Sequence, residues 1–194
     1  YYDKVYQAYS DEGLSQGLRT MDFAGTVVNT PADDFNAFYI FNHLWHHFLT
    51  SGIGLRQFCD WMMFLHVHKD EIDREKLRRI LTDMDLMTPW QAFGCVLVDR
   101  LGMPEDEFPF YDARKRSKVR KIVKRILEEG NFGKEREMYK DRSGEGYLKR
   151  KLKSFFLHSG RSLQLFFMFP SHIVRQYWYV LSRGVGAVWR DKVK

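Results

Sequence analysis

The sequence predicts a mainly α-helical fold, a multi-helix bundle with a small β-hairpin near its N-terminus. Apolar residues recur at helical spacing through most of residues 31–129. Proline and glycine stand where such helices would start and stop. A strand-like pattern is confined to residues 19–30. With 194 residues, 44% of them hydrophobic, the chain can bury the core of one domain and carry an appended tail.

The N-terminal part is expected to form a short helix, reaching about Leu14, and then the hairpin, which turns at Gly25. A longer helix follows. Its start is Thr30-Pro31-Ala32-Asp33, which offers a capping threonine, a proline at the first helical position and an acid two residues later. This helix is expected to end near Leu49.

Four more helices are predicted before residue 130. The helix at 55–68 is apolar nearly all round, which predicts a central position. Asp73 caps the next helix, Thr88-Pro89 opens another that stops at Gly102, and the last spans 114–129. In the helix that starts near Thr30 and in the one at 114–129, the apolar positions expected to face the core are Phe35, Phe38, Tyr39, Phe41, Trp45 and Phe48, and Val119, Ile122, Val123, Ile126 and Leu127.

The chain is expected to divide by composition. Polar, glycine-bearing residues predict a linker at 134–146, and an aromatic-rich stretch after it predicts a pair of helices hinged at Pro170. The expected parts are an N-terminal segment with the hairpin at 1–30, a helical core lobe at 31–133, the linker at 134–146 and the C-terminal helical pair at 147–194.

Positive charge is concentrated in one segment. The chain carries a formal charge of +6, but between Arg114 and Lys153 there are 16 Lys+Arg against 6 Asp+Glu. Such a segment suits phosphate, nucleic acid or another anionic surface, and it is also typical of a solvated helix face. Both interpretations stay open from the sequence.

Asp60 lies inside an otherwise apolar run from Phe58 to Leu65, so its carboxylate is expected to be buried on at least one side. Arg56 stands four residues earlier, on the same helical face. The pair is either a structural pin or a means of holding the Arg56 guanidinium towards a phosphate. We expect a structural polar cluster of Asp60, Gln57 and His46.

Three histidines share one face of the preceding helix. His43, His46 and His47 have the spacing i, i+3, i+4, and such a group can bind a metal, with His66 and His68 as further ligands. The sequence offers neither a Glu base nor a cysteine pair to complete a zinc site. Hydrogen bonding between these imidazoles and Asp60 is therefore preferred over metal binding.

The sequence gives little support for a catalytic cysteine, a serine nucleophile or a nucleotide-binding P-loop. Cys59 and Cys95 fall within apolar helical patterns and are expected to be small core residues in a reducing compartment. The sequence contains no Gly-x-Ser-x-Gly, no P-loop, no signal peptide and no apolar run of membrane-spanning length. The chain begins without a methionine and is expected to be a fragment or a processed form, located in the cytoplasm.

Several separated motifs carry a resemblance to a known family. They are Asn29-Thr30-Pro31 leading to His43 and His47-Phe48; Gly52-Ile53-Gly54-Leu55-Arg56-Gln57-Phe58-Cys59-Asp60-Trp61; Trp90-Gln91-Ala92-Phe93-Gly94-Cys95-Val96; Leu101-Gly102-Met103-Pro104; and Glu128-Glu129-Gly130-Asn131-Phe132-Gly133. In this order they resemble the C-terminal helical part of the uncharacterised nucleotidyltransferase family found in bacterial polysaccharide gene clusters.

The resemblance implies an α/β catalytic half upstream of Tyr1, which would carry the catalytic carboxylates and Mg²⁺. The present chain lacks that half and is expected to hold no cofactor and no catalytic residue of its own. It would be an accessory lobe that binds NTP or an unknown acceptor through Arg56, His43 and His47.

Two other readings come from the residues alone. One is a non-catalytic module that binds nucleic acid or polysaccharide through the basic segment 114–153. The other is peripheral membrane attachment through the aromatic C-terminal pair.

Overall fold

The structure is a computed structural model that describes residues 2–129 and 163–174. The chain divides into two compact units, Tyr1–Lys134 and Glu135–Lys194. In the second unit the described residues are helical at 163–168 and 170–174, so Pro170 opens a helical stretch. The predicted linker at 134–146 and most of the predicted C-terminal pair lie outside the described residues.

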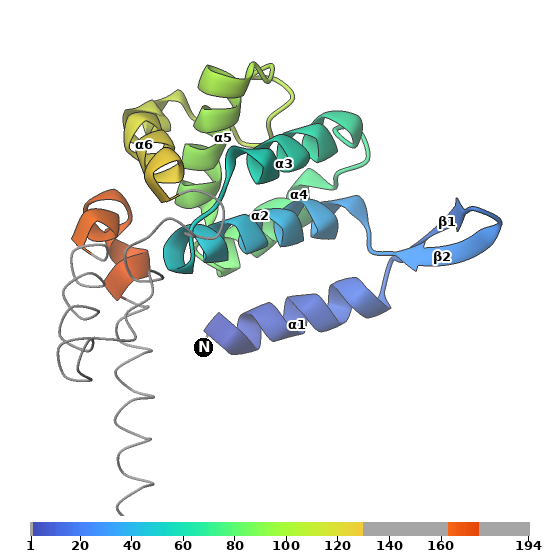
Figure 1. Cartoon of the computed structure of the whole chain (residues 1–194). Coiled ribbons are helices and arrows are strands. Elements are labelled where there is room, and N and C mark those ends of the chain that lie inside the picture. The colour runs from blue at the N-terminus through green and yellow to red at the C-terminus, as the bar shows by residue number, and fades with distance from the viewer. Residues whose placement is uncertain (1, 130–162, 175–194) are drawn as a thin grey trace, which may run out of the picture. The chain divides into compact units, whose positions relative to one another are not determined.

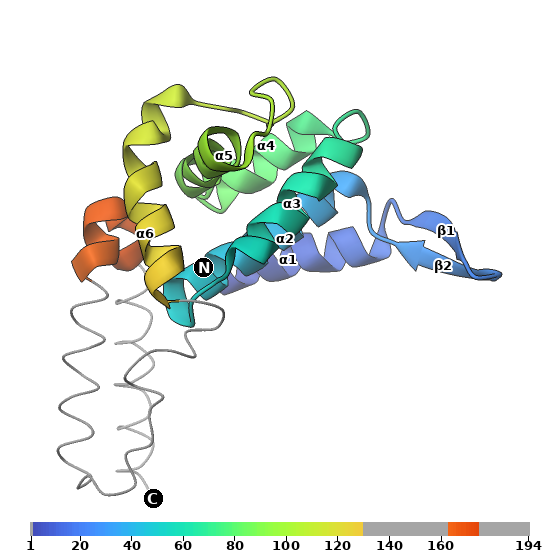
Figure 2. The same cartoon turned by 45° about the horizontal axis from the view of Figure 1, so that its top comes forward.

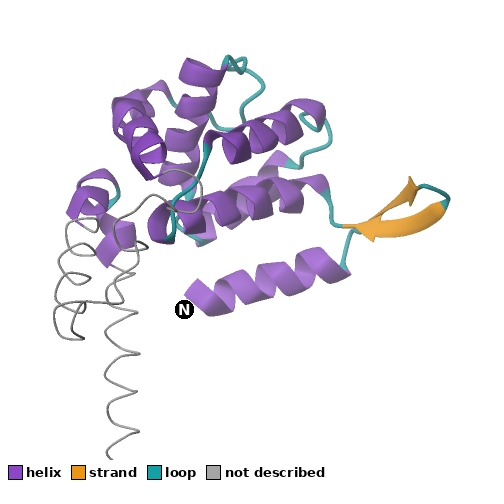
Figure 3. Ribbon diagram, viewed as in Figure 1, coloured by secondary structure: helices purple, strands orange, loops and turns teal. Residues whose placement is uncertain are grey.

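The first unit confirms the predicted fold class of helices with one small hairpin (Figure 1, Figure 3). In chain order its elements are α1 (Tyr2–Ser15), β1 (Arg19–Phe23), β2 (Thr26–Thr30), α2 (Asp33–Thr50), α3 (Leu55–Val67), α4 (Arg74–Asp83), α5 (Met87–Leu101), the 3₁₀ helix η1 (Ala113–Lys118) and α6 (Val119–Glu129).

The hairpin projects from the helical body (Figure 1). Its strands are antiparallel, with Met21 opposite Val28 and Phe23 opposite Thr26. Gly25 adopts a positive φ of 80° in the connecting turn, a conformation that glycine reaches without strain. Every residue of β1 is exposed, and the Phe23 side chain is 69% exposed.

α1 lies along α2 and α4. Tyr6 places its ring 6.4 Å from that of Phe38, and Gly13 leaves the space that the Phe35 ring occupies. The Tyr9 hydroxyl donates a hydrogen bond to Asp83 at the end of α4. The short predicted helix at the N-terminus is thus present and packed on the bundle.

The core is a set of large aromatic side chains from α2, α3, α5 and the loop after α5. The Phe41 ring lies 5.4 Å from Trp61, 5.1 Å from Trp90 and 5.7 Å from Phe93. Phe108, from the loop, packs 5.6 Å from Trp61. Edge-to-face contacts of this kind add specific geometry to apolar burial. Rings from three helices and one loop therefore pack against one another in a single aromatic core.

Helix starts were predicted unequally well. Asp73 is the N-cap of α4 as expected, and its side chain accepts from the backbone N–H groups of Glu75 and Lys76. Thr30 and Thr88 are not caps. α2 starts after Ala32, because Thr30 still pairs with Arg19 in the hairpin, and α5 starts one residue before Thr88.

The helices differ from the prediction in three respects. α3 is not central, because it buries Phe58, Trp61 and Leu65 but leaves Met63 and Val67 exposed. The helix predicted at 114–129 begins as the 3₁₀ helix η1 and continues as α6, which is labelled in Figure 2. Two apolar residues predicted in the core are exposed, Tyr39 on α2 and Leu127 on α6.

Candidate functional site: the outer face of α2 and α3

A tight turn joins α2 to α3 and fixes the first residues of α3. The backbone N–H groups of Ser51 and Gly52 both donate to the His47 carbonyl, and Gly52 adopts a φ of 91°. The Gly54 N–H then donates to Gln57 Oε1 at 3.1 Å. Gln57 therefore caps the start of α3, and the glycines of the motif serve the turn.

The structure brings the three histidines of α2 together. The ring centres of His43 and His47 are 4.4 Å apart, and those of His46 and His47 are 5.7 Å apart. His47 Nδ1 lies 2.6 Å from Ser51 Oγ. Burial, followed by the proximity of His43 and of His46, lowers the pKa of His47. His47 is consequently a neutral imidazole near pH 7, which donates a hydrogen bond from one ring nitrogen and accepts one at the other.

Arg56 and Asp60 face each other across one helical turn, but outside the core. Arg56 Nε lies 4.0 Å from Asp60 Oδ2, and the two side chains are 91% and 66% exposed. The expectation of a buried carboxylate is wrong. On a helix, residue 60 lies about 100° from the buried Trp61, so an apolar run does not bury every member.

The two helices run antiparallel, which relates these groups in space. The turn joins the end of α2 to the start of α3, and at the other end His68 Nδ1 lies 3.3 Å from Asp33 Oδ1. Arg56 therefore falls roughly level with the histidines near the end of α2, and Asp60 lies one turn further along α3. Among the exposed residues of α3 and α2 are Arg56, His43 and His46, whose guanidinium and imidazoles are groups that bind phosphate.

Asp99 and Arg100 lie at the exposed end of α5, where Asp99 accepts from Arg116 Nε at 3.1 Å. Within residues 2–129 and 163–174, no group of three or more His, Cys, Asp or Glu side chains is arranged to hold a metal ion. None of the helices in that part of the chain has the length and apolar character needed to cross a membrane.

Sequence reasoning missed a polar centre at the start of α2. Asp33 is buried and pairs with Arg19 of β1 and with His68, the residue that ends α3. This carboxylate ties the hairpin to the helical body. The sequence presents Asp33 only as an acid in a first helical turn, and nothing local indicates partners 14 and 35 residues away.

A second missed cluster joins α3 to the loop after α5. Glu107 accepts from Lys69 at 2.9 Å and lies 2.5 Å from His66 Nδ1. The hydrogen bonds from His66 and Lys69 lower the pKa of Glu107. The cluster holds one end of the long loop against α3.

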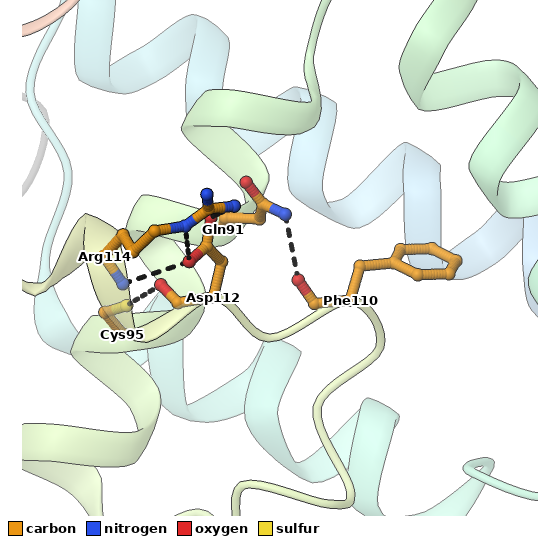
Figure 4. Close-up of polar contacts among 5 residues, drawn as sticks. All are labelled: Gln91, Cys95, Phe110, Asp112 and Arg114. Carbon is orange, nitrogen blue, oxygen red and sulfur yellow. Dashed lines mark hydrogen bonds and ion pairs between the residues drawn. The ribbon is translucent and has the colours of Figure 1, made fainter.

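α5 fixes the rest of that loop through its own side chains (Figure 4). Trp90 donates to the Pro109 carbonyl at 2.8 Å, Gln91 to Phe110 at 3.1 Å, and the Cys95 thiol to Asp112 at 3.4 Å. Burial raises the pKa of Cys95 to about 11, so the thiol stays protonated and is a poor nucleophile. The motif from Trp90 to Val96 therefore has a structural role.

No curated protein and no solved structure matches the chain. The family described as "Uncharacterised nucleotidyltransferase" matches residues 2–101, which include α1, the hairpin, α2, α3, α4 and α5. This match covers more than half of the chain, and it contains every residue of the face described above. The chain belongs to the uncharacterised nucleotidyltransferase family.

Proposed function

We propose that the chain is the helical lobe of a nucleotidyltransferase, and that the outer face of α2 and α3 binds the phosphates of an NTP or of its acceptor. In this role Arg56 supplies the cation, while His43 and His47 add hydrogen bonds. The lobe would work beside an α/β catalytic domain.

The observation that carries the proposal is the exposure of Arg56 at the start of α3. Its side chain is 91% exposed, and Asp60 Oδ2 lies 4.0 Å from Arg56 Nε without covering the guanidinium. A helix N-terminus carries a partial positive charge, which adds to that of Arg56. Arginine recognises phosphate through two parallel hydrogen bonds, so an accessible guanidinium suits this ligand.

The protonation of His47 is expected to make the binding of an anionic ligand depend on pH. His47 is neutral near pH 7 because burial and the other two imidazoles disfavour its charged form. A phosphate placed beside it would favour protonation, since an opposite charge raises the pKa of an imidazole. Binding is therefore expected to take up a proton in the weakly acidic range.

Under the proposal, the chemistry of transfer comes from the catalytic domain. A nucleotidyltransferase uses Mg²⁺ held by carboxylates, and residues 2–129 and 163–174 contain no group of three or more His, Cys, Asp or Glu side chains arranged to hold a metal. Under the proposal, the carboxylates and Mg²⁺ belong to the catalytic domain. The lobe contributes binding and orientation.

Isothermal titration of the chain with each of the four common NTPs tests the proposal. Arg56→Ala is expected to weaken NTP binding by about tenfold, as expected for the loss of a charge-assisted contact. Arg74→Ala is the matched control, because Arg74 is an exposed arginine in the first turn of α4. A chain that binds none of the four NTPs, or an Arg56→Ala variant that binds as well as the unchanged chain, contradicts the proposal.

A further inference from the structure

Positive charge also gathers on η1 and α6, away from the face of α2 and α3. Between Arg114 and Arg125 the chain carries eight Lys+Arg and no Asp or Glu. Four of these eight side chains form ion pairs or are buried, as described next. Lys115, Lys118 and Lys121 recur at intervals of three residues.

The arginines and one lysine of this stretch have defined surroundings. Arg114 Nε donates to Asp112 at 2.9 Å, and Arg116 donates to Asp99 at 3.1 Å and to Glu105 at 2.6 Å. Lys124 Nζ lies 3.6 Å from Glu128. Arg125 is buried with its guanidinium 5.3 Å from the centre of the Phe48 ring, and Arg120 is exposed.

Lys115, Lys118 and Lys121, which we call the lysine ridge, follow one another at intervals of three residues. In a 3₁₀ helix residues i and i+3 lie directly above one another, so Lys115 and Lys118 share one line of η1. Lys121 lies one α-helical turn further. The ridge therefore places three ammonium groups in a row about 10 Å long.

The three charges are close enough to affect one another. Burial, followed by the charges of Lys115 and Lys121, lowers the pKa of Lys118. In the described part of the chain neither Lys115 nor Lys121 forms an ion pair. The nearest carboxylate to Lys115 in sequence, Asp112, is held by Arg114. Like charges in a row destabilise a fold, and an anionic ligand would relieve that repulsion.

We propose that the lysine ridge binds the phosphodiester backbone of a nucleic acid strand. A row of cations matches a chain of regularly repeated phosphates better than it matches a single phosphate group. Lys115, Lys118 and Lys121 have no aromatic residue between them, so base stacking is absent and binding is expected to be independent of base sequence. The eight further Lys+Arg between Lys134 and Lys153 extend the same charge in the sequence.

The test is fluorescence anisotropy of the full 194-residue chain with a labelled single-stranded RNA of mixed sequence, at several salt concentrations. Lys115→Glu/Lys121→Glu is expected to weaken binding by about tenfold or more, and to reduce the slope of log affinity against log salt by about 1.4. Arg74→Glu/Lys76→Glu on α4 makes the same change in net charge and is the control, expected to retain most of the affinity.

Folding is checked by thermal unfolding. The ridge variant is expected to melt at or above the temperature of the unchanged chain, because it removes like-charge repulsion. A neutral variant, Lys115→Gln/Lys121→Gln, should also bind RNA more weakly than the unchanged chain, with a smaller loss of affinity than the Glu variant. A DNA strand of the same sequence is expected to bind with similar affinity.

Three results would overturn the proposal. The first is equal loss in the ridge variant and the α4 control, which would mean that only net charge matters. The second is an unchanged salt slope in the ridge variant. The third is tighter binding of a sulfated polysaccharide than of RNA, which would assign the ridge to an anionic polysaccharide instead.

Discussion

Gly94 of α5 lies directly beneath the ring of Phe108, so that a methyl group at Gly94 would overlap the ring atoms. Phe108 is itself buried against Trp61 and Trp90 and has no room to withdraw. Gly94→Ala is therefore expected to destabilise the fold by about 1–3 kcal/mol, as overpacking does, although alanine favours helix. Urea unfolding at pH 7 measures this change.

The expected loss of stability comes from overlap with the Phe108 ring and not from a change in helix propensity. A double variant separates the two causes. Phe108→Leu removes the overlapping atoms, so Gly94→Ala/Phe108→Leu should lose less stability than the sum of the two single changes. Additive losses would show that Gly94 is needed for a reason other than contact with Phe108.

Arg56→Ala is expected to change the free energy of unfolding by less than about 0.5 kcal/mol, because exposed ion pairs contribute little. The pair with Asp60 is long, and both side chains are mainly exposed. Arg125→Ala is the contrasting variant, since it removes a buried side chain packed on Phe48 and should cost more. If Arg56→Ala costs as much as Arg125→Ala in urea unfolding, then Arg56 has a structural role.

The helices and the hairpin could be predicted because their signals are local. Apolar spacing and a capping residue such as Asp73 depend only on neighbours along the chain. Thr30 failed as a cap because its backbone is taken by a strand partner, Arg19. Where a residue could belong to either of two elements, its pairing with residues far away in the sequence decides which one it joins. A local sequence pattern does not contain that information.

The sequence predicted which histidines lie close together on α2, but not the exposure of Asp60. The spacing of His43 and His47 places them on one side of α2, as the 4.4 Å ring separation shows. The apolar residues around Asp60 predict an enclosed carboxylate, whereas α3 leaves one whole side uncovered by the described residues. Asp33 was missed because its burial depends on partners from other elements.

His47 is expected to titrate below the ordinary histidine pKa of 6.5. Burial and two neighbouring imidazoles disfavour its charged form. NMR titration of the imidazole Cε1–H signals measures the value. His43→Gln removes one neighbouring imidazole and should move the pKa of His47 upwards; no movement would mean that burial and His46 set it without His43.

The same shift predicts how stability depends on pH. A neutral His47 is favoured in the fold, so its contribution is present above the unfolded pKa of about 6.5 and is lost as pH falls through the lower folded pKa. His47→Gln should flatten the fall in unfolding free energy across this range. An unchanged slope below pH 6.5 would assign the loss to other groups.

Arg19→Ala is expected to loosen the hairpin from the body, because Arg19 pairs with the buried Asp33. The change leaves that carboxylate with His68 as its remaining described partner, and should cost about 1–3 kcal/mol, since half of the Arg19 side chain is already exposed. Hydrogen exchange measures the local effect: the exchange of the β1 and β2 amides should speed up by a larger factor than that of the α5 amides, which follow only the global loss of stability. The control is Arg79→Ala, which removes a longer exposed pair with Glu12 and should leave the hairpin amides unaffected. Equal exchange of the hairpin amides in both variants would mean that the strands hold their position without Asp33.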